Sequence, residues 1–257
     1  MYYFKEYSHY LLRRLIRKHR VAGTLLEVGC GRGENLVFLA RLGFGGAGID
    51  LSESALEHAR HRLAAEASRI VLLQRDLFAM EGAFNLVVAL DVLEHIADEK
   101  KALNQMHHLL GRQNSLLILG VPGGPYMADD PSFGHFRRYE REGLIRLLRQ
   151  CHFEVKDCLT LGYPFLYYAR VLANRLTKLP ADHLTPAELE ANTLNSDVEH
   201  PLKNSIFAKA LNAALGFPPS RMLLRALLRT QDVFSRWPTG HVYLVAASPC
   251  PSNASAS

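Results

Sequence analysis

A short glycine-rich loop holds the residues whose spacing says most about chemistry. It follows an apolar run, Thr24–Val28, and precedes an apolar-periodic segment at 34–42; its glycines are Gly29, Gly31 and Gly33. We expect a strand, a tight turn and a helix, in which a ligand can approach the backbone closely because no Cβ stands in the way. Asp50 ends a second apolar run about 20 residues further on, where an α/β nucleotide fold places the carboxylate that binds a ribose diol.

Two nucleotide-derived ligands compete for a loop of this kind, a dinucleotide cofactor and S-adenosylmethionine (SAM). The dinucleotide fingerprint G-x-G-x-x-G, counted from Gly29, needs a glycine at position 34, where this chain has Glu34. A glutamate at that helix start would also repel a pyrophosphate. Because SAM carries no phosphate, the spacing favours SAM as the cofactor.

Two histidines follow later apolar strands. His95 comes after the run at 85–90, and His135 lies after the run at 115–121, with Asp129 and Asp130 upstream to orient it. Ligands of open α/β sheets bind at the carboxyl ends of the strands, so both histidines belong to the expected site. Methyl transfer needs proximity, alignment and removal of a proton from the acceptor, and a histidine is a natural base for that. The alternative for His95 is a turn-capping role.

Strands and helices alternate around these residues. Apolar runs such as 86–90 and 116–119 are typical of a parallel sheet covered on both faces. We predict a first helix at 7–18 and further helices at 34–42, 53–65, 98–110 and 140–150. The predicted strands are 24–28, 46–50, 70–74, 85–90, 115–121, 153–160 and 241–246.

The regular alternation stops at Gly162, which divides the chain. We predict an N-terminal helical segment at 1–22 that covers the site, and a core formed by 23–162 and 241–247. Residues 163–240 are too long for a plain loop, so we expect a helical cap that shapes the acceptor pocket and excludes water. The low-complexity tail at 248–257 is predicted to be disordered.

Composition sets broad limits. The 257 residues are 48% hydrophobic, and no apolar stretch reaches the roughly 18 residues that a membrane span needs. The four cysteines lack metal-ligand spacing, which favours reduced thiols in the cytoplasm, and scattered histidines such as His58 and His61 indicate a solvated surface, so we expect no metal. The net charge of +5 invites nucleic acid, but the basic residues alternate with leucine at helical spacing, as on amphipathic helices, so we expect no nucleic-acid partner.

Taken together, these motifs resemble those of the class I SAM-dependent methyltransferases, in particular the bacterial small-molecule type. The resemblance covers about residues 5–160 and the final strand. It rests on 26–33 (LEVGCGRG), 48–52 (GIDLS), Asp76, 91–96 (DVLEHI), 134–139 (GHFRRY) and the helical lead-in 9–13 (HYLLR). It implies an α/β fold with a Rossmann-like, seven-stranded, mostly parallel sheet, an antiparallel last strand and a helical cap inserted before that strand. One departure is Asn85, where the family usually has Asp.

The resemblance also implies a set of cofactor-binding residues. The glycine loop would bracket the methionine part of SAM, and Asp50 would accept both ribose hydroxyls through charge-assisted bonds. Asp76 would accept from the adenine amino group, unless it caps the next turn instead. The implied set is Glu27, Gly29, Cys30, Gly31, Asp50, Leu51, Asp76, Leu77, Leu90 and Asp91, the last two beside the sulfonium.

The acceptor side is less defined by motif. As catalytic residues we expect His95, His135 and Tyr139. As substrate-binding residues we expect Tyr7, Arg137, Arg138 and Tyr163, because a guanidinium fork holds carboxylates or phosphates and tyrosines line aromatic pockets. The alternatives are surface pairing of the arginines with Glu140 and Glu142, and plain packing of the tyrosines.

The sequence therefore predicts a SAM-dependent methyltransferase that acts on an oxygen or nitrogen of a small-molecule acceptor. One alternative is a lipid-linked acceptor at a membrane surface, with peripheral contact through segments 165–176 and 221–234, which mix leucine, aromatic residues and arginine as interfacial helices do. Another is a catalytically silent SAM-binding partner subunit. The acceptor's identity and the oligomeric state stay open.

Overall fold

The computed structural model describes residues 2–64, 69–111, 114–127, 130–164, 167–168, 171–172, 185, 187–189 and 235–250, without the side chains of 2–6 and 132. The helices are α1 (Tyr2–Lys18), α2 (Glu34–Arg41), α3 (Glu53–Ala64), α4 (Glu99–Leu109) and α5 (Arg141–Gln150). The strands are β1 (Thr24–Val28), β2 (Gly45–Asp50), β3 (Ile70–Gln74), β4 (Leu86–Leu90), β5 (Leu116–Pro122), β6 (Phe153–Leu161) and β7 (Val242–Pro249). Short helical turns are η1 (Leu77–Ala79), η2 (Leu93–His95) and η3 (Pro131–Phe133).

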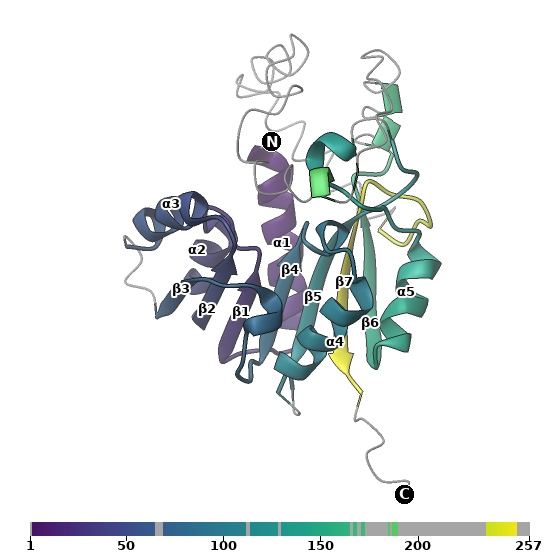
Figure 1. The fold of residues 1–257 in the computed structure, drawn as a ribbon. Helices are drawn as coiled ribbons and strands as arrows, with labels where there is room; N and C mark the ends of the chain where they lie inside the picture. The colour runs from purple at the N-terminus through teal and green to yellow at the C-terminus, as the bar shows by residue number, and fades with distance from the viewer. Residues whose placement is uncertain are drawn as a thin grey trace, which may run out of the picture.

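The strands form one seven-stranded sheet in the order β3-β2-β1-β4-β5-β7-β6 (Figure 1). β1 pairs in parallel with β2 and β4, β2 with β3, and β4 with β5, whereas β7 runs antiparallel to both β5 and β6. The predicted mostly parallel sheet with an antiparallel last strand is thereby confirmed. The predicted cap at 163–240 lies almost entirely outside the described residues.

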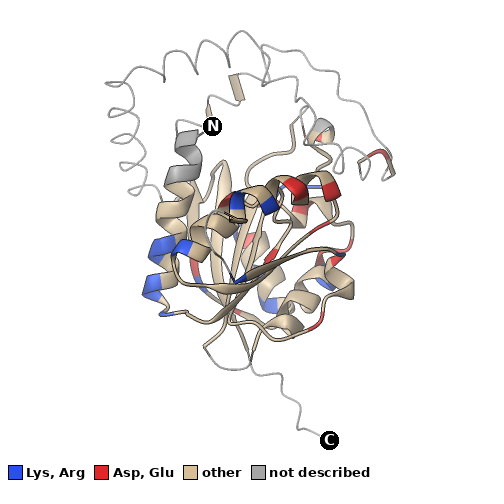
Figure 2. Ribbon diagram, turned by 90° about the vertical axis from the view of Figure 1, so that its left-hand side faces the viewer, with Lys and Arg blue, Asp and Glu red and all other residues tan. Residues whose placement is uncertain are grey.

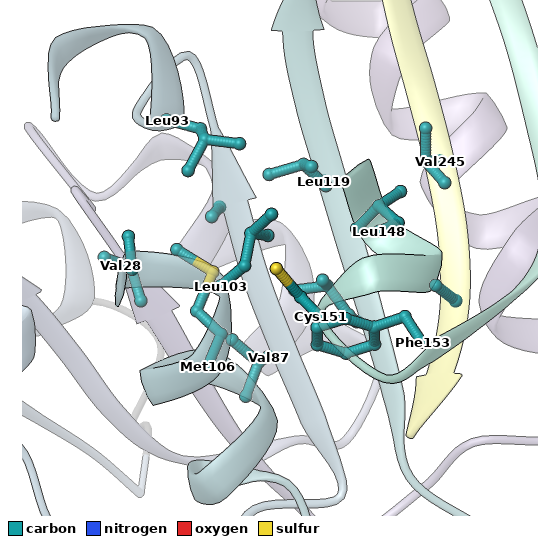
Figure 3. Packing of buried hydrophobic residues seen from close by; sticks show 14 of the residues in the cluster. Val28, Val87, Leu93, Leu103, Met106, Leu119, Leu148, Cys151, Phe153 and Val245 are labelled. Carbon is teal, nitrogen blue, oxygen red and sulfur yellow. The ribbon is translucent and has the colours of Figure 1, made fainter. Parts of the chain in front are cut away.

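The two faces of the sheet are both buried, as the continuous apolar strands require. Val87 and Leu119 lie in a core cluster with residues of α4 and α5, part of which is shown in Figure 3. Val88 and Ile118, the neighbouring residues on the same strands, lie in a second cluster with residues of α1, α2 and α3. Successive side chains of a strand point to opposite faces, so each strand contributes to both clusters.

Several element boundaries differ from those predicted. The first helix begins at Tyr2 instead of Tyr7, and β7 continues to Pro249 instead of ending at 246. Ser248 and Pro249, which the sequence assigned to the tail, pair with Glu154 and Phe153 of β6. Ser248 and Pro249 are ordered in a strand because β6 lies beside them, and the composition of the tail gives no sign of that partner. Residues 251–257 lie outside the described part of the chain.

Helix α1 is amphipathic and covers one face of the sheet. Leu12 and Leu15 are buried in the second core cluster. The basic residues of the helix are exposed: Arg13, Arg14, Arg17 and Lys18. Figure 2 shows Lys and Arg positions in blue along this helix. This arrangement is the solvated face that the leucine spacing indicates.

The end of α1 is fixed to the sheet by Asp157 of β6. Its carboxylate accepts a hydrogen bond from Lys18 Nζ at 2.5 Å and one from His19 Nε2 at 2.6 Å, and its side chain is 15% exposed. Burial raises the pKa of Asp157, but the bonds from Lys18 and His19 outweigh this and lower the pKa below its ordinary value. The ionised carboxylate therefore stabilises the folded state.

We expect Asp157→Asn to lower the free energy of unfolding by about 1–3 kcal/mol at pH 7, because it removes hydrogen bonds between charged groups. A carboxylate whose pKa is lowered by folding stabilises the folded state at pH values above its unfolded-state pKa. This stabilisation is lost as the pH falls through the folded-state pKa. The difference between variant and wild type should thus shrink below about pH 4. Urea denaturation at several pH values measures it. Glu154→Gln on the same strand, at an exposed carboxylate, is the control and should change stability by less than about 0.5 kcal/mol.

Candidate functional site

The glycine loop joins β1 to α2 at the carboxyl edge of the sheet. Gly29, Gly31 and Gly33 all have positive φ, at 65°, 50° and 74°. A Cβ on Gly29 would lie 2.5 Å from Val92 Cγ2, so this position admits only glycine. A Cβ on Gly31 would meet no atom of the described residues within 4 Å. The loop therefore presents bare backbone to open space, as a cradle for a ligand must.

Asp50 stands beside this cradle, at the end of β2. Its Oδ2 accepts a hydrogen bond from Gly31 N at 2.7 Å, and its Oδ1 accepts one from Ser52 N at 2.9 Å. A carboxylate oxygen has two acceptor sites, so each oxygen can also accept a hydroxyl. The neighbouring Leu51 is 51% exposed, an apolar side chain that a bound nucleoside could cover. These features fit the ribose of SAM.

A chain of hydrogen bonds ties the cradle to α1. Asn35 Nδ2 donates to Glu27 Oε1 at 2.9 Å, and Asn35 Oδ1 is 3.0 Å from His9 Nε2, which donates because the amide oxygen can only accept. Glu27 is 1% exposed. Asn35 is a site residue that was not predicted from the sequence. It lies in the first turn of α2, two residues after Gly33, and no motif marks that position.

Cys30 lies in the same loop but is not a nucleophile. It is 5% exposed. Burial raises the pKa of its thiol, and the negative charges of Glu27 and Asp50 raise it further. A thiol held in its protonated form packs as a small apolar group.

The expected adenine contacts come from the end of β3. Asp76 caps η1, because its Oδ1 accepts from Phe78 N at 2.7 Å, which is the capping role left open by the sequence. One capping bond leaves acceptor capacity on the carboxylate. Leu77 is buried, whereas Asp91 after β4 is exposed, with φ of 54° and its N–H bound to Gly120 O at 2.9 Å. Leu90 is half-buried and packs over Gly120.

His95 and His135 meet although they come from different loops. Their ring centroids are 4.9 Å apart, with the rings inclined at 69°. His95 Nδ1 donates to Gly134 O at 3.1 Å, and Phe136 N donates to Glu94 O at 2.9 Å. These bonds tie the turn after β4 to the loop after β5, and so bring together the two residues that we call the histidine pair.

The two rings differ in their electrostatic surroundings. Burial lowers the pKa of His95 to about 4, and the neighbouring His135 adds to the effect, so His95 is neutral at pH 7. His135 Nδ1 donates to Asp130 Oδ1 at 2.8 Å. Asp130 has no exposed surface and also accepts from Met127 N at 2.7 Å and from Arg138 Nε at 2.8 Å. Asp129, the other suggested orienting residue, lies outside the described part of the chain.

Arg137 and Arg138 bind the protein itself. Arg137 donates to Ile96 O and Ala97 O, both at 2.7 Å. The side chain of Arg138 is 4% exposed, and besides Asp130 it binds Gly123 O at 2.5 Å. The expected role of these two arginines in substrate binding does not fit such contacts, because their donors hold the loop in place.

The expected catalytic role of Tyr139 does not fit its surroundings either. The residue is 6% exposed in the core, and its hydroxyl donates to Glu99 Oε2 at 2.8 Å. Burial raises the pKa of Tyr139, and the negative Glu99 raises it further, so the phenol stays protonated. Tyr139 therefore helps to fix the loop, and its proton is not available to an acceptor.

The two expected substrate tyrosines have different environments. Tyr7 is 5% exposed and belongs to the core cluster beneath α1, which favours the packing role. Tyr163 is half-buried and stacks on Trp237, with ring centroids 5.6 Å apart and an interplanar angle of 14°. This stack joins the two ends of the segment at 163–240.

The strand order, the glycine cradle after β1 and the carboxylate at the end of β2 define a Rossmann-like protein that binds a nucleoside-containing cofactor. A methyltransferase-domain family model matches residues 2–157. The chain belongs to this family and is a SAM-dependent methyltransferase.

Known proteins agree with this assignment. The chain is 30% identical over 169 residues to a ubiquinone biosynthesis O-methyltransferase of Pseudomonas paraeruginosa, covering 59% of this chain and 73% of that protein. A SAM-dependent methyltransferase from Clostridium acetobutylicum has a similar fold, with a TM-score of 0.51, 16% identity and coverage of 61% and 83% of the two chains. Magnesium protoporphyrin IX methyltransferase from Synechocystis, solved with bound S-adenosylhomocysteine (SAH), also has a similar fold. Its TM-score is 0.51 at 20% identity, and the match covers 60% of this chain and 75% of that chain.

Proposed function

We propose that this enzyme transfers the methyl group of SAM to an oxygen of a small-molecule acceptor, and that the acceptor's reacting group lies at the histidine pair. The observation that carries the proposal is the pairing of His95 with an Asp130-bound His135, at the sheet edge that also holds the glycine cradle. The similar Pseudomonas protein is named as an O-methyltransferase, which supports oxygen over nitrogen.

On the cofactor side, the backbone around Gly29 and Gly31 would hold the methionine part of SAM, and Asp50 would hold the ribose. Asp76 would accept from the adenine amino group with the acceptor capacity that its capping bond leaves. Leu90, the last residue of β4, and Asp91 after it would line the sulfonium end, because β4 pairs with β1, the strand that leads into the cradle.

His135 is the better candidate for the base. A base with a pKa of about 4, as for His95, gives little driving force for taking a proton from a hydroxyl near neutral pH. Asp130 behind His135 holds the ring by its Nδ1 and leaves Nε2 as the acceptor of a proton. The acceptor's O–H proton then passes to His135 Nε2, the oxygen bonds to the methyl carbon, and the C–S bond breaks with its electron pair left on sulfur, releasing SAH.

Two alternatives were named from the sequence: a lipid-linked acceptor at a membrane surface and a catalytically silent SAM-binding subunit. Of the helices that the structure describes, none is both long and apolar enough to cross a bilayer. The segments that suggested membrane-surface contact, 165–176 and 221–234, lie largely outside the described residues. A cytoplasmic location remains a prediction, and release of SAH with any acceptor would exclude a silent subunit.

Asp50→Ala tests the cofactor side. Removing a charged acceptor of two hydroxyl bonds should weaken SAH binding by about 1–3 kcal/mol, or roughly 5- to 150-fold in Kd. Calorimetric titration with SAH measures this. Glu57→Gln, at an exposed carboxylate on the nearby helix α3, is the matched control and should bind as wild type does. An unchanged Kd in Asp50→Ala would refute the ribose assignment. The acceptor itself is found by screening phenols, alcohols and amines for SAH release.

A further inference from the structure

Glu94 is the least satisfied polar group among the described residues. It follows β4 within η2, has no exposed surface, and neither carboxylate oxygen has a hydrogen-bond partner in the described part of the chain. Burial raises its pKa well above the ordinary value, and the charge of Asp91 adds to the effect. A buried carboxyl without partners costs several kcal/mol unless something compensates it. No step of the direct-base mechanism uses Glu94.

The missing partner is suggested by what surrounds this carboxylate. Glu94, His95 and His135 each offer one ligand atom, and the three atoms lie within 4.8 Å of one another. Both histidines donate from Nδ1, His95 to Gly134 O and His135 to Asp130, because a carbonyl and a carboxylate can only accept. The lone pair of each ring is thereby placed on Nε2. Metal-binding histidines are oriented in the same way, by a carbonyl or carboxylate behind the ring.

We propose that Glu94, His95 and His135 bind one divalent transition-metal cation of the Zn²⁺ or Co²⁺ type. Two neutral imidazoles and one carboxylate are a ligand set that such cations prefer, with remaining positions open to another ligand. Tetrahedral coordination places ligand atoms about 3.4 Å apart, so binding would draw the three atoms closer than their present limit of 4.8 Å. The sequence had indicated no metal. His135 is far along the chain from Glu94 and His95, so no metal-ligand spacing is visible there.

The cation deepens the proposed function and, in its catalytic part, rests on it. An acceptor hydroxyl bound at an open position becomes more acidic, because the cation stabilises the oxyanion. Its proton leaves to solvent, the oxygen bonds to the methyl carbon, and the C–S bond breaks toward sulfur. His135 then acts as a ligand instead of a base. Glu94 separates the two mechanisms, since only the cation mechanism requires it.

Titration with Co²⁺ tests the site directly. The wild-type protein is stripped with a chelator, dialysed and titrated with Co²⁺, whose visible absorption reports coordination by protein ligands. We expect one equivalent per chain, displaced by Zn²⁺, and a Kd at least about 100-fold weaker in Glu94→Gln and in His135→Ala. His61→Ala, at an exposed histidine on α3, is the matched control and should bind as wild type does. Bound Zn²⁺ should also raise the melting temperature of wild type but not of Glu94→Gln.

The possible outcomes separate this inference from the proposed function. Absence of stoichiometric Co²⁺ and Zn²⁺ binding by folded wild-type protein, or binding that survives Glu94→Gln, overturns the metal site. SAH titration of the stripped protein is run in parallel, and wild-type SAH affinity there leaves the cofactor assignment standing whichever way the metal result falls. Melting curves of the metal-free variants show that each is folded.

Discussion

Replacing Asp130 with asparagine is expected to lower the free energy of unfolding by about 3–5 kcal/mol, because it strands a buried guanidinium. Asp130 has no exposed surface, and the side chain of Arg138 is 4% exposed, so water cannot replace the lost partner. The same carboxylate holds Met127 N and His135 Nδ1. Its loss should therefore loosen the loop that positions His135. Urea denaturation at pH 7 measures the effect.

A double variant identifies the cause of that loss. Asp130→Asn combined with Arg138→Met removes the stranded charge, so the pair should be less destabilised than the sum of the two single variants. Glu99→Gln, at the start of α4, is the comparison, because Glu99 also binds a residue of this loop. It accepts the Tyr139 hydroxyl at a partly exposed position and should cost only about 1 kcal/mol. A loss below about 1 kcal/mol for Asp130→Asn would mean that the buried ion pair does not hold the loop.

His135→Ala is expected to lower turnover on the acceptor found by SAH release by about 100- to 10,000-fold. Its affinity for SAH should stay within a few-fold of wild type, because the cradle and Asp50 are untouched. The measurement is kcat at saturating SAM. Wild-type turnover in this variant would leave proximity and alignment as the whole of catalysis.

Two further variants tell which chemistry His135 performs. If His135 is a direct base, Glu94→Gln should keep near-wild-type turnover and His95→Ala should lose much less than His135→Ala. If the three residues hold a cation, all three variants should fall together, and added Zn²⁺ should not restore them. The comparison uses the same acceptor and the same SAM concentration throughout.

Much of the scaffold could be predicted because it depends on local patterns. β1 and β3 have the predicted bounds, and the other strands differ from prediction mainly at their ends. Continuous apolar runs indicate buried strands, and glycine at Gly29 and Gly31 marks a turn that only glycine adopts easily. Asp50 could be placed because the distance from glycine loop to carboxylate reflects one strand–helix–strand unit. All of these signals lie within short windows of sequence.

The acceptor side could not be predicted, because it depends on which distant segments meet. From sequence alone, an arginine can be taken for a substrate ligand because its partners are unknown. In the structure, Arg138 is bound to Asp130 and to Gly123 O. The pKa of His95 depends on its burial and on the neighbouring His135, which lies in the loop after β5. In the sequence, Glu94 is only one position of the motif at 91–96. In the fold, it is a buried carboxylate beside two imidazoles. The sequence by itself determined the sheet and the cofactor cradle, since their signals are periodic and local, whereas tertiary packing alone decided which polar groups are enclosed and what faces them.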